Sequence, residues 1–254
     1  MIGTVCKEII KELGIYVFVE TGTDMGETIA EAAKWFSGMD PKFGKISDYV
    51  TTGARGYSLE SKPIRYPVFE DVGDSKFKIF SVDIDSYSFK NAKKLFKTNL
   101  NISLFCANSS EFLKDFIDRN IFKSSQTIFF LDAHWGKYWP LRDEIKQILK
   151  LEKFVIVIDD FFVPGLSNSA KPHGNFGFDF YHSRILCWGY IDYLFNNIDV
   201  KVYYPKQPNK DHRGFVLLFK GYNSEELGFL KGLLLEHIDK DDPAHSRPVP
   251  LSPR

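Results

Sequence analysis

Residues 17–28, VFVETGTDMGET, decide the fold class of this chain of 254 residues. The stretch starts as a short apolar run that ends on Glu20. It then breaks into a segment that carries Gly22, Asp24 and Gly26. This pattern predicts a buried strand, a tight glycine turn and the first turn of a helix. Such a turn directs backbone N–H groups and the positive helix end into a crevice, where open α/β sheets hold nucleotide-like ligands.

Composition limits the class of protein. The 44% of hydrophobic and 26% of charged positions are enough for one large globular domain. Lys plus Arg and Asp plus Glu both total 33, so the overall field attracts neither nucleic acid nor anionic lipid. No apolar stretch approaches the about 20 residues of a membrane-spanning helix, and the N-terminus lacks the layout of a signal peptide. Three scattered cysteines form neither a disulfide framework nor a zinc motif. We expect a cytoplasmic protein without nucleic-acid or membrane partners.

Seven apolar runs predict the strands of one sheet. Unbroken apolar runs that alternate with helix-like segments indicate a parallel sheet covered on both faces. The last two runs are joined by the polar stretch PKQPNKDHRG, which predicts a hairpin. We therefore predict an α/β fold with a Rossmann-like, doubly wound, seven-stranded and mostly parallel sheet that has an antiparallel C-terminal hairpin strand. The predicted strands lie near residues 17–20, 78–85, 102–107, 127–131, 154–158, 200–204 and 215–219.

Two irregular stretches rich in glycine and proline interrupt this alternation. Residues 37–75 form a predicted insertion, which could supply a lid, substrate contacts or the contact between two copies in a homodimer. Residues 161–182 follow a strand's carboxyl end and are a predicted substrate loop. An amphipathic helix over residues 225–237 is expected to close a single domain of residues 1–240. The proline-rich residues 241–254 are expected to be a disordered tail.

The spacing of the glycines argues against a dinucleotide cofactor. A dinucleotide-binding turn has the pattern GxGxxG, whereas Glu20, Gly22 and Gly26 give ExGxxxG. An acid at the strand tip repels phosphate but suits a cationic ligand. Asp83, at the end of the second predicted strand, can accept hydrogen bonds from a ribose diol. Together these features favour a nucleoside without a pyrophosphate.

Two longer motifs carry a family resemblance: FLDAHWGKYWPLRDEI at residues 130–145 and VIVIDDFFVPG at residues 155–165. With them the chain resembles the class I S-adenosylmethionine (SAM)-dependent methyltransferases over most of residues 15–220. The motifs look like those of metal-dependent catechol-type O-methyltransferases and related enzymes acting on sugars and natural products. The resemblance implies SAM and Mg²⁺ as cofactors and a small-molecule hydroxyl as acceptor. A catechol acceptor is not implied, because the lid helices that precede the first strand in that group are nearly absent.

The resemblance also implies where the site residues lie. Metal ligands are expected after the fourth and fifth strands, at Asp132, Asp159 and Asp160. Cofactor contacts are predicted at Glu20, Thr21, Gly22, Gly26, Thr28, Asp83, Ile84, Asn108, Ser109 and Asp132. The candidates for the base that removes the hydroxyl proton are His134, Lys137 and His182.

Elementary electrostatics supports a cation beside the three aspartates. Carboxylates gathered at neighbouring strand ends raise each other's pKa unless a cation neutralises them, and all-oxygen ligation suits Mg²⁺. The alternative is that Asp159 and Asp160 only bond loop amides. The sequence thus predicts a SAM-dependent O-methyltransferase that acts on a hydroxyl of a small polar molecule, such as a sugar or secondary metabolite, with Mg²⁺. A metal-independent methyltransferase, a non-catalytic binding protein on the same fold and a dinucleotide oxidoreductase stay open as alternatives.

Overall fold

The computed structural model describes residues 2–43, 45–52, 64–70, 75–120, 126–134, 138–168, 176–181, 184–207, 213–233 and 235–239. For residues 45–52, 64–70 and 181 it describes the backbone only. The predicted catalytic residues Lys137 and His182, the predicted tail and parts of both irregular stretches lie outside the described residues.

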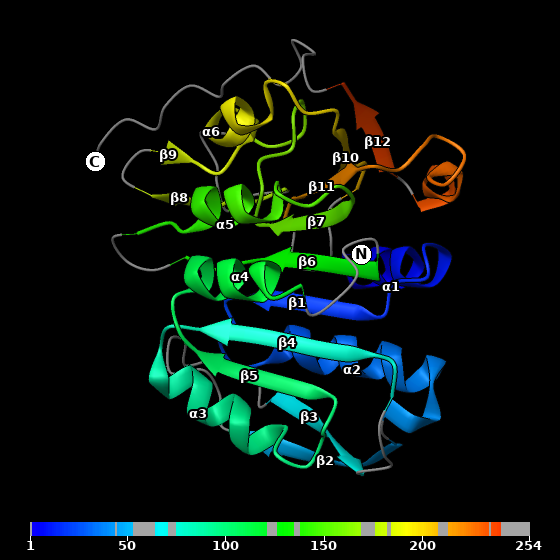
Figure 1. Cartoon of the computed structure of the whole chain (residues 1–254), viewed down its shortest axis with the longest axis vertical. Helices are drawn as coiled ribbons and strands as arrows, with labels where there is room; N and C mark the ends of the chain where they lie inside the picture. Colours follow the sequence, from blue (N-terminus) through cyan, green and yellow to red (C-terminus); the bar gives the residue numbers. More distant parts are fainter. Residues whose placement is uncertain are drawn as a thin grey trace.

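One mixed sheet forms the centre of the molecule, with the order β12-β10-β11-β7-β6-β1-β4-β5 (Figure 1). The five strands from β5 to β7 are parallel, and β11, β10 and β12 continue the sheet as antiparallel neighbours. The chain order reverses beside β1, which makes the carboxyl end of β1 the switch point where such sheets bind ligands. The strands are β1 (Val17–Thr21), β4 (Lys78–Asp83), β5 (Ile102–Cys106), β6 (Thr127–Leu131), β7 (Phe154–Asp159), β10 (Lys201–Pro205), β11 (Phe215–Lys220) and β12 (Leu235–Ile238).

The sheet has eight strands, so the predicted count of seven is wrong by one. The extra strand is β12, which pairs antiparallel with β10 where the sequence predicted the end of a helix over residues 225–237. A short 3₁₀ helix, η4 (Gly228–Leu233), precedes it. In β12, Leu235 is buried while Glu236 and His237 are exposed. The segment forms a strand because the edge of β10 offers backbone hydrogen-bond partners, which outweigh the local helical pattern.

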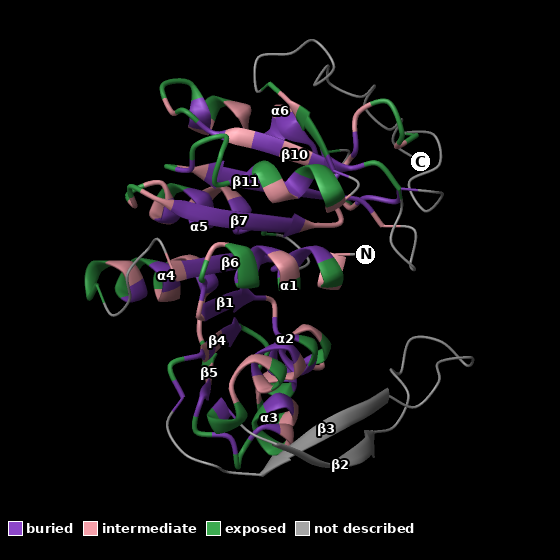
Figure 2. Cartoon of the chain, turned by 90° about the vertical axis from the view of Figure 1, so that its right-hand side faces the viewer, coloured by how far each residue is buried: buried purple, intermediate pink, exposed green. Residues whose placement is uncertain are grey.

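Helices cover both faces of the sheet, as predicted for a doubly wound fold. Val17 and Val19 of β1 pack with one set of helices, whereas Phe18 packs with the other, because successive side chains of a strand point to opposite faces. Figure 2 shows α4 and α5 on one side and α1 and α2 on the other. The helices are α1 (Ile2–Glu12), α2 (Glu27–Met39), α3 (Ser86–Leu95), α4 (Ser109–Asp118), α5 (Leu141–Ile148) and α6 (Trp188–Ile191), with 3₁₀ turns η1 (Pro41–Phe43) and η3 (Asp192–Phe195).

Both irregular stretches contain short sheets that the sequence did not predict. The insertion holds the antiparallel pair β2 (Lys45–Thr52) and β3 (Ile64–Glu70). The second stretch leads into a two-stranded ribbon of β8 (Phe180–Tyr181) and β9 (Arg184–Ile185). Within the described part of the chain, no helix has both the length and the apolar character needed to cross a membrane.

Candidate active site

The turn between β1 and α2 has the tight geometry that the glycines predict. Gly22 and Gly26 both adopt left-handed backbone angles, with φ of 85° and 79°. A Cβ atom on Gly22 would lie 2.7 Å from the backbone oxygen of Asp132. The missing side chain therefore lets the end of β1 pass directly against the end of β6. This close approach brings the turn and the predicted metal acid to one place.

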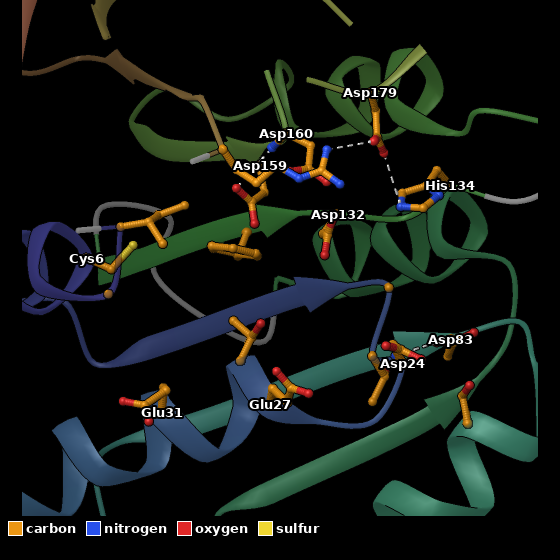
Figure 3. A pocket seen from close by; sticks show the side chains of 18 of the residues that line it. Cys6, Asp24, Glu27, Glu31, Asp83, Asp132, His134, Asp159, Asp160 and Asp179 are labelled. Atoms are coloured by element: carbon orange, nitrogen blue, oxygen red, sulfur yellow. Dashed lines mark hydrogen bonds and ion pairs between the residues drawn. The ribbon is translucent and has the colours of Figure 1, made fainter. Parts of the chain in front are cut away.

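A cavity of about 800 Å³ opens at this place, beside the carboxyl ends of β1, β4, β6 and β7 (Figure 3). Its volume is in the range of small-molecule sites, roughly 300–1,000 Å³. Four of the predicted cofactor residues line it: Gly22, Thr28, Asp83 and Asp132. The other lining residues are Ile2, Gly3, Cys6, Thr23, Asp24, Glu27, Glu31, Trp35, Asp85, Ser88, Phe130, His134, Asp159, Asp160, Asp179 and Arg213.

Asp83 is fixed at the end of β4 by two backbone donors. Its Oδ2 accepts the N–H of Asp24 at 2.8 Å, and its Oδ1 accepts the N–H of Asp85 at 2.8 Å. Asp83 is only 6% exposed, and this burial raises the pKa of its carboxyl. Each carboxylate oxygen has a second lone pair, so Asp83 can still accept bonds from a ligand in the cavity.

Several predicted cofactor residues are not among those that line the cavity. Glu20 is 1% exposed and accepts a hydrogen bond from the hydroxyl of Ser81. Asn108 caps α4 with its side chain, and Ser109 is fully buried. The sequence predicts Glu20 against the methionine part of the cofactor; its carboxylate bonds Ser81 and does not line the cavity, so this contact stays a prediction. Thr21, Gly26 and Ile84 are likewise absent from the lining.

Burial raises the pKa of Glu20 to about 8, although the hydroxyls of Ser81 and Thr28 lower it. When folding raises the pKa of an acid, the folded protein becomes less stable as the pH rises from the pKa of the unfolded state to that of the folded state. For Glu20 the pKa of the unfolded state is near 4.5. We therefore expect the free energy of unfolding of Glu20→Gln, minus that of the wild type, to grow by about 2 to 4 kcal/mol between pH 5 and pH 8.5. Urea denaturation at both pH values measures this difference. A difference that stays constant with pH contradicts the raised pKa.

The three predicted metal ligands meet at the cavity. Asp132 follows β6, and Asp159 and Asp160 end and follow β7, the neighbouring strand. Burial, and then the charges of Asp159 and Asp160, raise the pKa of Asp132 well above its ordinary value. The prediction that these carboxylates converge is thus confirmed by the geometry.

Their arrangement, however, does not fit a magnesium site. The Oδ1 of Asp160 lies 3.3 Å from Nε of Arg213, so this carboxylate is already paired with a cation. The Oδ1 of Asp159 accepts the N–H of Asp160 at 2.9 Å. No group of three or more His, Cys, Asp or Glu side chains in the described ranges is arranged so that it could hold a metal ion. Magnesium binding stays a prediction.

His134 belongs to a charged network on the cavity wall. Its Nε2 lies 3.3 Å from Oδ2 of Asp179, and the Oδ1 of Asp179 lies 3.3 Å from Nη1 of Arg213 (Figure 3). Arg213 in turn reaches Asp160, so the network joins the loops after β6 and β7 to the chain before β11. The imidazole is thus oriented by a carboxylate while more than half of its side chain is exposed (56%). This pairing is how proteins commonly prepare a general base.

The sequence did not single out Asp179 or Arg213. Asp179 lies in the aromatic stretch NFGFDFY and Arg213 in the polar stretch PKQPNKDHRG, where nothing in the spacing marks a site. Arg213 reaches the cavity because β11 pairs antiparallel with β7, with Phe215 opposite Asp159. That register is a tertiary property, which no local sequence signal could reveal.

Comparison with known proteins shows which solved structures share this fold. No protein-family model and no curated protein sequence matches the chain. A protein from Klebsiella pneumoniae assigned as an O-methyltransferase superposes with a TM-score of 0.53 at 10% identity, over 87% of this chain and 80% of its own. TomG of Streptomyces achromogenes, an O-methyltransferase involved in tomaymycin synthesis and solved in complex with SAM, gives 0.51 at 11% identity, over 86% and 78%.

A third solved structure agrees with these two. A protein from Staphylococcus aureus assigned as a caffeoyl-CoA O-methyltransferase gives a TM-score of 0.50 at 11% identity, over 86% of this chain and 82% of its own. Matches at such low sequence identity show a shared fold but do not show a shared reaction. The chain has the fold of the class I O-methyltransferases.

Proposed function

We propose that this protein is a SAM-dependent O-methyltransferase that acts on a hydroxyl of a small polar molecule, such as a sugar or secondary metabolite. The observation that carries the proposal is the cavity at the switch point, which joins the glycine turn after β1 to the fixed carboxylate of Asp83. Ligands of open α/β sheets bind at this position. Cys6, Cys106 and Cys187 form no disulfide bond, which supports the further proposal of a cytoplasmic location.

The cavity wall has the charge that a SAM molecule requires. Gly22, Thr23 and Thr28 would lie along the donor's amino-acid portion, and Asp83 would accept from the ribose hydroxyls. Asp24 adds a carboxylate to the same wall, which favours a sulfonium cation over a phosphate. When bound, SAM supplies an electrophilic methyl group on sulfur.

His134 is the base in this proposal. An Nε2–H donated to Asp179 leaves Nδ1 as the acceptor for the hydroxyl proton of the methyl acceptor. The acceptor oxygen forms a bond to the methyl carbon as the carbon–sulfur bond breaks, and the proton moves to Nδ1. Asp179 stabilises the imidazolium that results, while Arg213 holds Asp179 in position.

Transfer of a labelled methyl group tests the function. The protein is incubated with methyl-tritiated SAM and a panel of sugars, phenols and other hydroxyl compounds, and matched amines serve as the comparison. The proposal expects label in an ether product of at least one hydroxyl compound, with an equal amount of S-adenosylhomocysteine (SAH) formed. Label that enters only the amines contradicts O-methylation, and no label in any acceptor contradicts the proposed activity.

The ion pair between Arg213 and Asp160 favours a metal-independent form of this reaction. For Asp160 to bind a cation such as Mg²⁺, it would first have to lose the guanidinium, which carries the opposite charge. We therefore expect kcat to stay within about twofold after treatment with EDTA, since the neutralising charge belongs to the protein. A loss of activity that added Mg²⁺ restores would contradict this form and support the metal site predicted from the sequence.

A further inference from the structure

A buried polar cluster lies behind the proposed donor site and takes no part in the chemistry described above. It consists of Thr21, Ser109 and Glu144, whose side chains are all 0% exposed. Both carboxylate oxygens of Glu144 and both hydroxyl oxygens lack a hydrogen-bond partner among the described residues. Buried polar atoms without partners are costly, so their retention calls for an explanation.

The three side chains nevertheless lie beside one another. The hydroxyls of Ser109 and Thr21 lower the pKa of Glu144, against the larger effect of burial, which brings it to about 7. The hydroxyl dipoles thus reach the carboxylate, although the atoms do not have full hydrogen-bond geometry. A small movement of the chain would complete two charge-assisted hydrogen bonds.

The cluster joins the two segments that hold the proposed donor site. Thr21 is the last residue of β1, directly before Gly22, and its carbonyl accepts the N–H of Asp132 at 3.1 Å. Ser109 is the first residue of α4. Glu144 lies in the first turn of α5, which packs against α4. One carboxylate therefore faces both the turn after β1 and the start of α4.

We propose that Glu144 is a positioning residue, which accepts hydrogen bonds from the Thr21 and Ser109 hydroxyls when the donor binds and so fixes the turn after β1 against the start of α4. This inference rests on the proposed function. Glu144 also has electrostatic interactions with Asp143 and Tyr138, to which it makes no hydrogen bond. Among the residues that the structure describes, we assign the connection between the turn and α4 to Glu144, on which both Thr21 and Ser109 act.

Calorimetric titration with SAH tests the inference, alongside a melting curve for every variant. Glu144→Leu removes both acceptors and should weaken SAH binding by about 10-fold. Glu144→Gln should restore the affinity to within about threefold of the wild type, because its amide can accept from one hydroxyl and donate to the other. Rescue by the amide distinguishes positioning from a general need for a well-packed side chain.

The matched control is Gln147→Leu, one turn further along α5. Its Oε1 is also buried and without a partner, but it does not belong to the cluster. This variant is expected to change the melting temperature and leave the SAH affinity within twofold of the wild type. If Glu144→Leu binds SAH within twofold of the wild type, or Gln147→Leu weakens binding equally, the inference is wrong.

Smaller changes keep the test decisive if Glu144→Leu does not fold. Thr21→Val and Ser109→Ala each remove one hydroxyl and should each weaken SAH binding by about threefold. Unchanged affinity in both contradicts the inference. A wild-type protein that binds no SAH contradicts the proposed function, and the inference falls with it. A wild type that binds SAH while the variants bind it equally well contradicts the inference alone.

Discussion

Methyl transfer by a His134→Ala variant is expected to be slower than in the wild type by a factor of about 100 or more in kcat, the usual contribution of a positioned base. The reason is the geometry of the cavity wall, where Nε2 of His134 lies 3.3 Å from Asp179 and the other ring nitrogen is left to take the proton. SAH affinity should stay within twofold, because His134 is assigned to the acceptor and not to the donor. Single-turnover rates with the acceptor found by the labelling experiment measure the effect.

Two further variants test the role of Asp179 and provide a control for the His134→Ala variant. Asp179→Asn keeps an acceptor for the imidazole N–H but removes the charge, so we expect a decrease in kcat of about 10-fold. His237→Ala is the matched control, since its Nε2 lies 3.8 Å from Oδ1 of Asp239 in a similar exposed pair at β12, and it should leave kcat unchanged. A His134→Ala rate within threefold of the wild type rules out His134 as the base. Lys137 and His182 would then be the remaining predicted candidates.

A Gly22→Ala variant should lose about 2 to 4 kcal/mol of unfolding free energy and bind SAH at least about 10-fold more weakly. Its Cβ would lie 2.7 Å from the backbone oxygen of Asp132 and 2.9 Å from the nitrogen of Ala133. Backbone atoms cannot move aside as the end of a flexible side chain can, so the turn itself must shift. Urea denaturation and SAH calorimetry on the same preparation measure both effects.

Gly14→Ala separates the two causes of this loss. Gly14 also has a left-handed backbone, with φ of 63°, but a Cβ there would meet no atom within 4 Å. It should therefore cost only the conformational strain, about 1 kcal/mol, and leave SAH binding unchanged. Equal destabilisation by the two variants would show that strain, and not the close approach to β6, explains the role of Gly22.

The fold was predictable where local pattern and tertiary structure agree. The apolar runs of β1, β6 and β7 are buried along almost their whole length, so their unbroken composition indicated parallel strands correctly (Figure 2). β12 was missed because a four-residue edge strand is defined by its neighbour β10 and not by its own pattern. The sheets within the two irregular stretches were missed because glycine and proline conceal strand periodicity.

The site was predictable only where residues sit at strand ends. Asp83, Asp132 and Asp159 could be placed from the sequence because parallel strands bring their carboxyl ends to one edge. The pairing of Arg213 with Asp160 depends on how β11 lies against β7, which the sequence does not encode locally. The burial of Glu20 beside Ser81 depends on the packing of β4 against β1, which the local sequence does not encode.

Binding of SAH to the wild-type protein tests whether the cavity beside β1 is a site for SAM. Calorimetry at pH 7.5 should show one site per chain, and Asp83→Ala should abolish measurable binding, since this carboxylate is the assigned partner of the ribose. Asp85→Ala is the comparison, because Asp85 lines the same cavity but caps α3 with its carboxylate. We expect binding by the wild type and by Asp85→Ala and none by Asp83→Ala. No binding by the wild type, or unchanged affinity in Asp83→Ala, would contradict it.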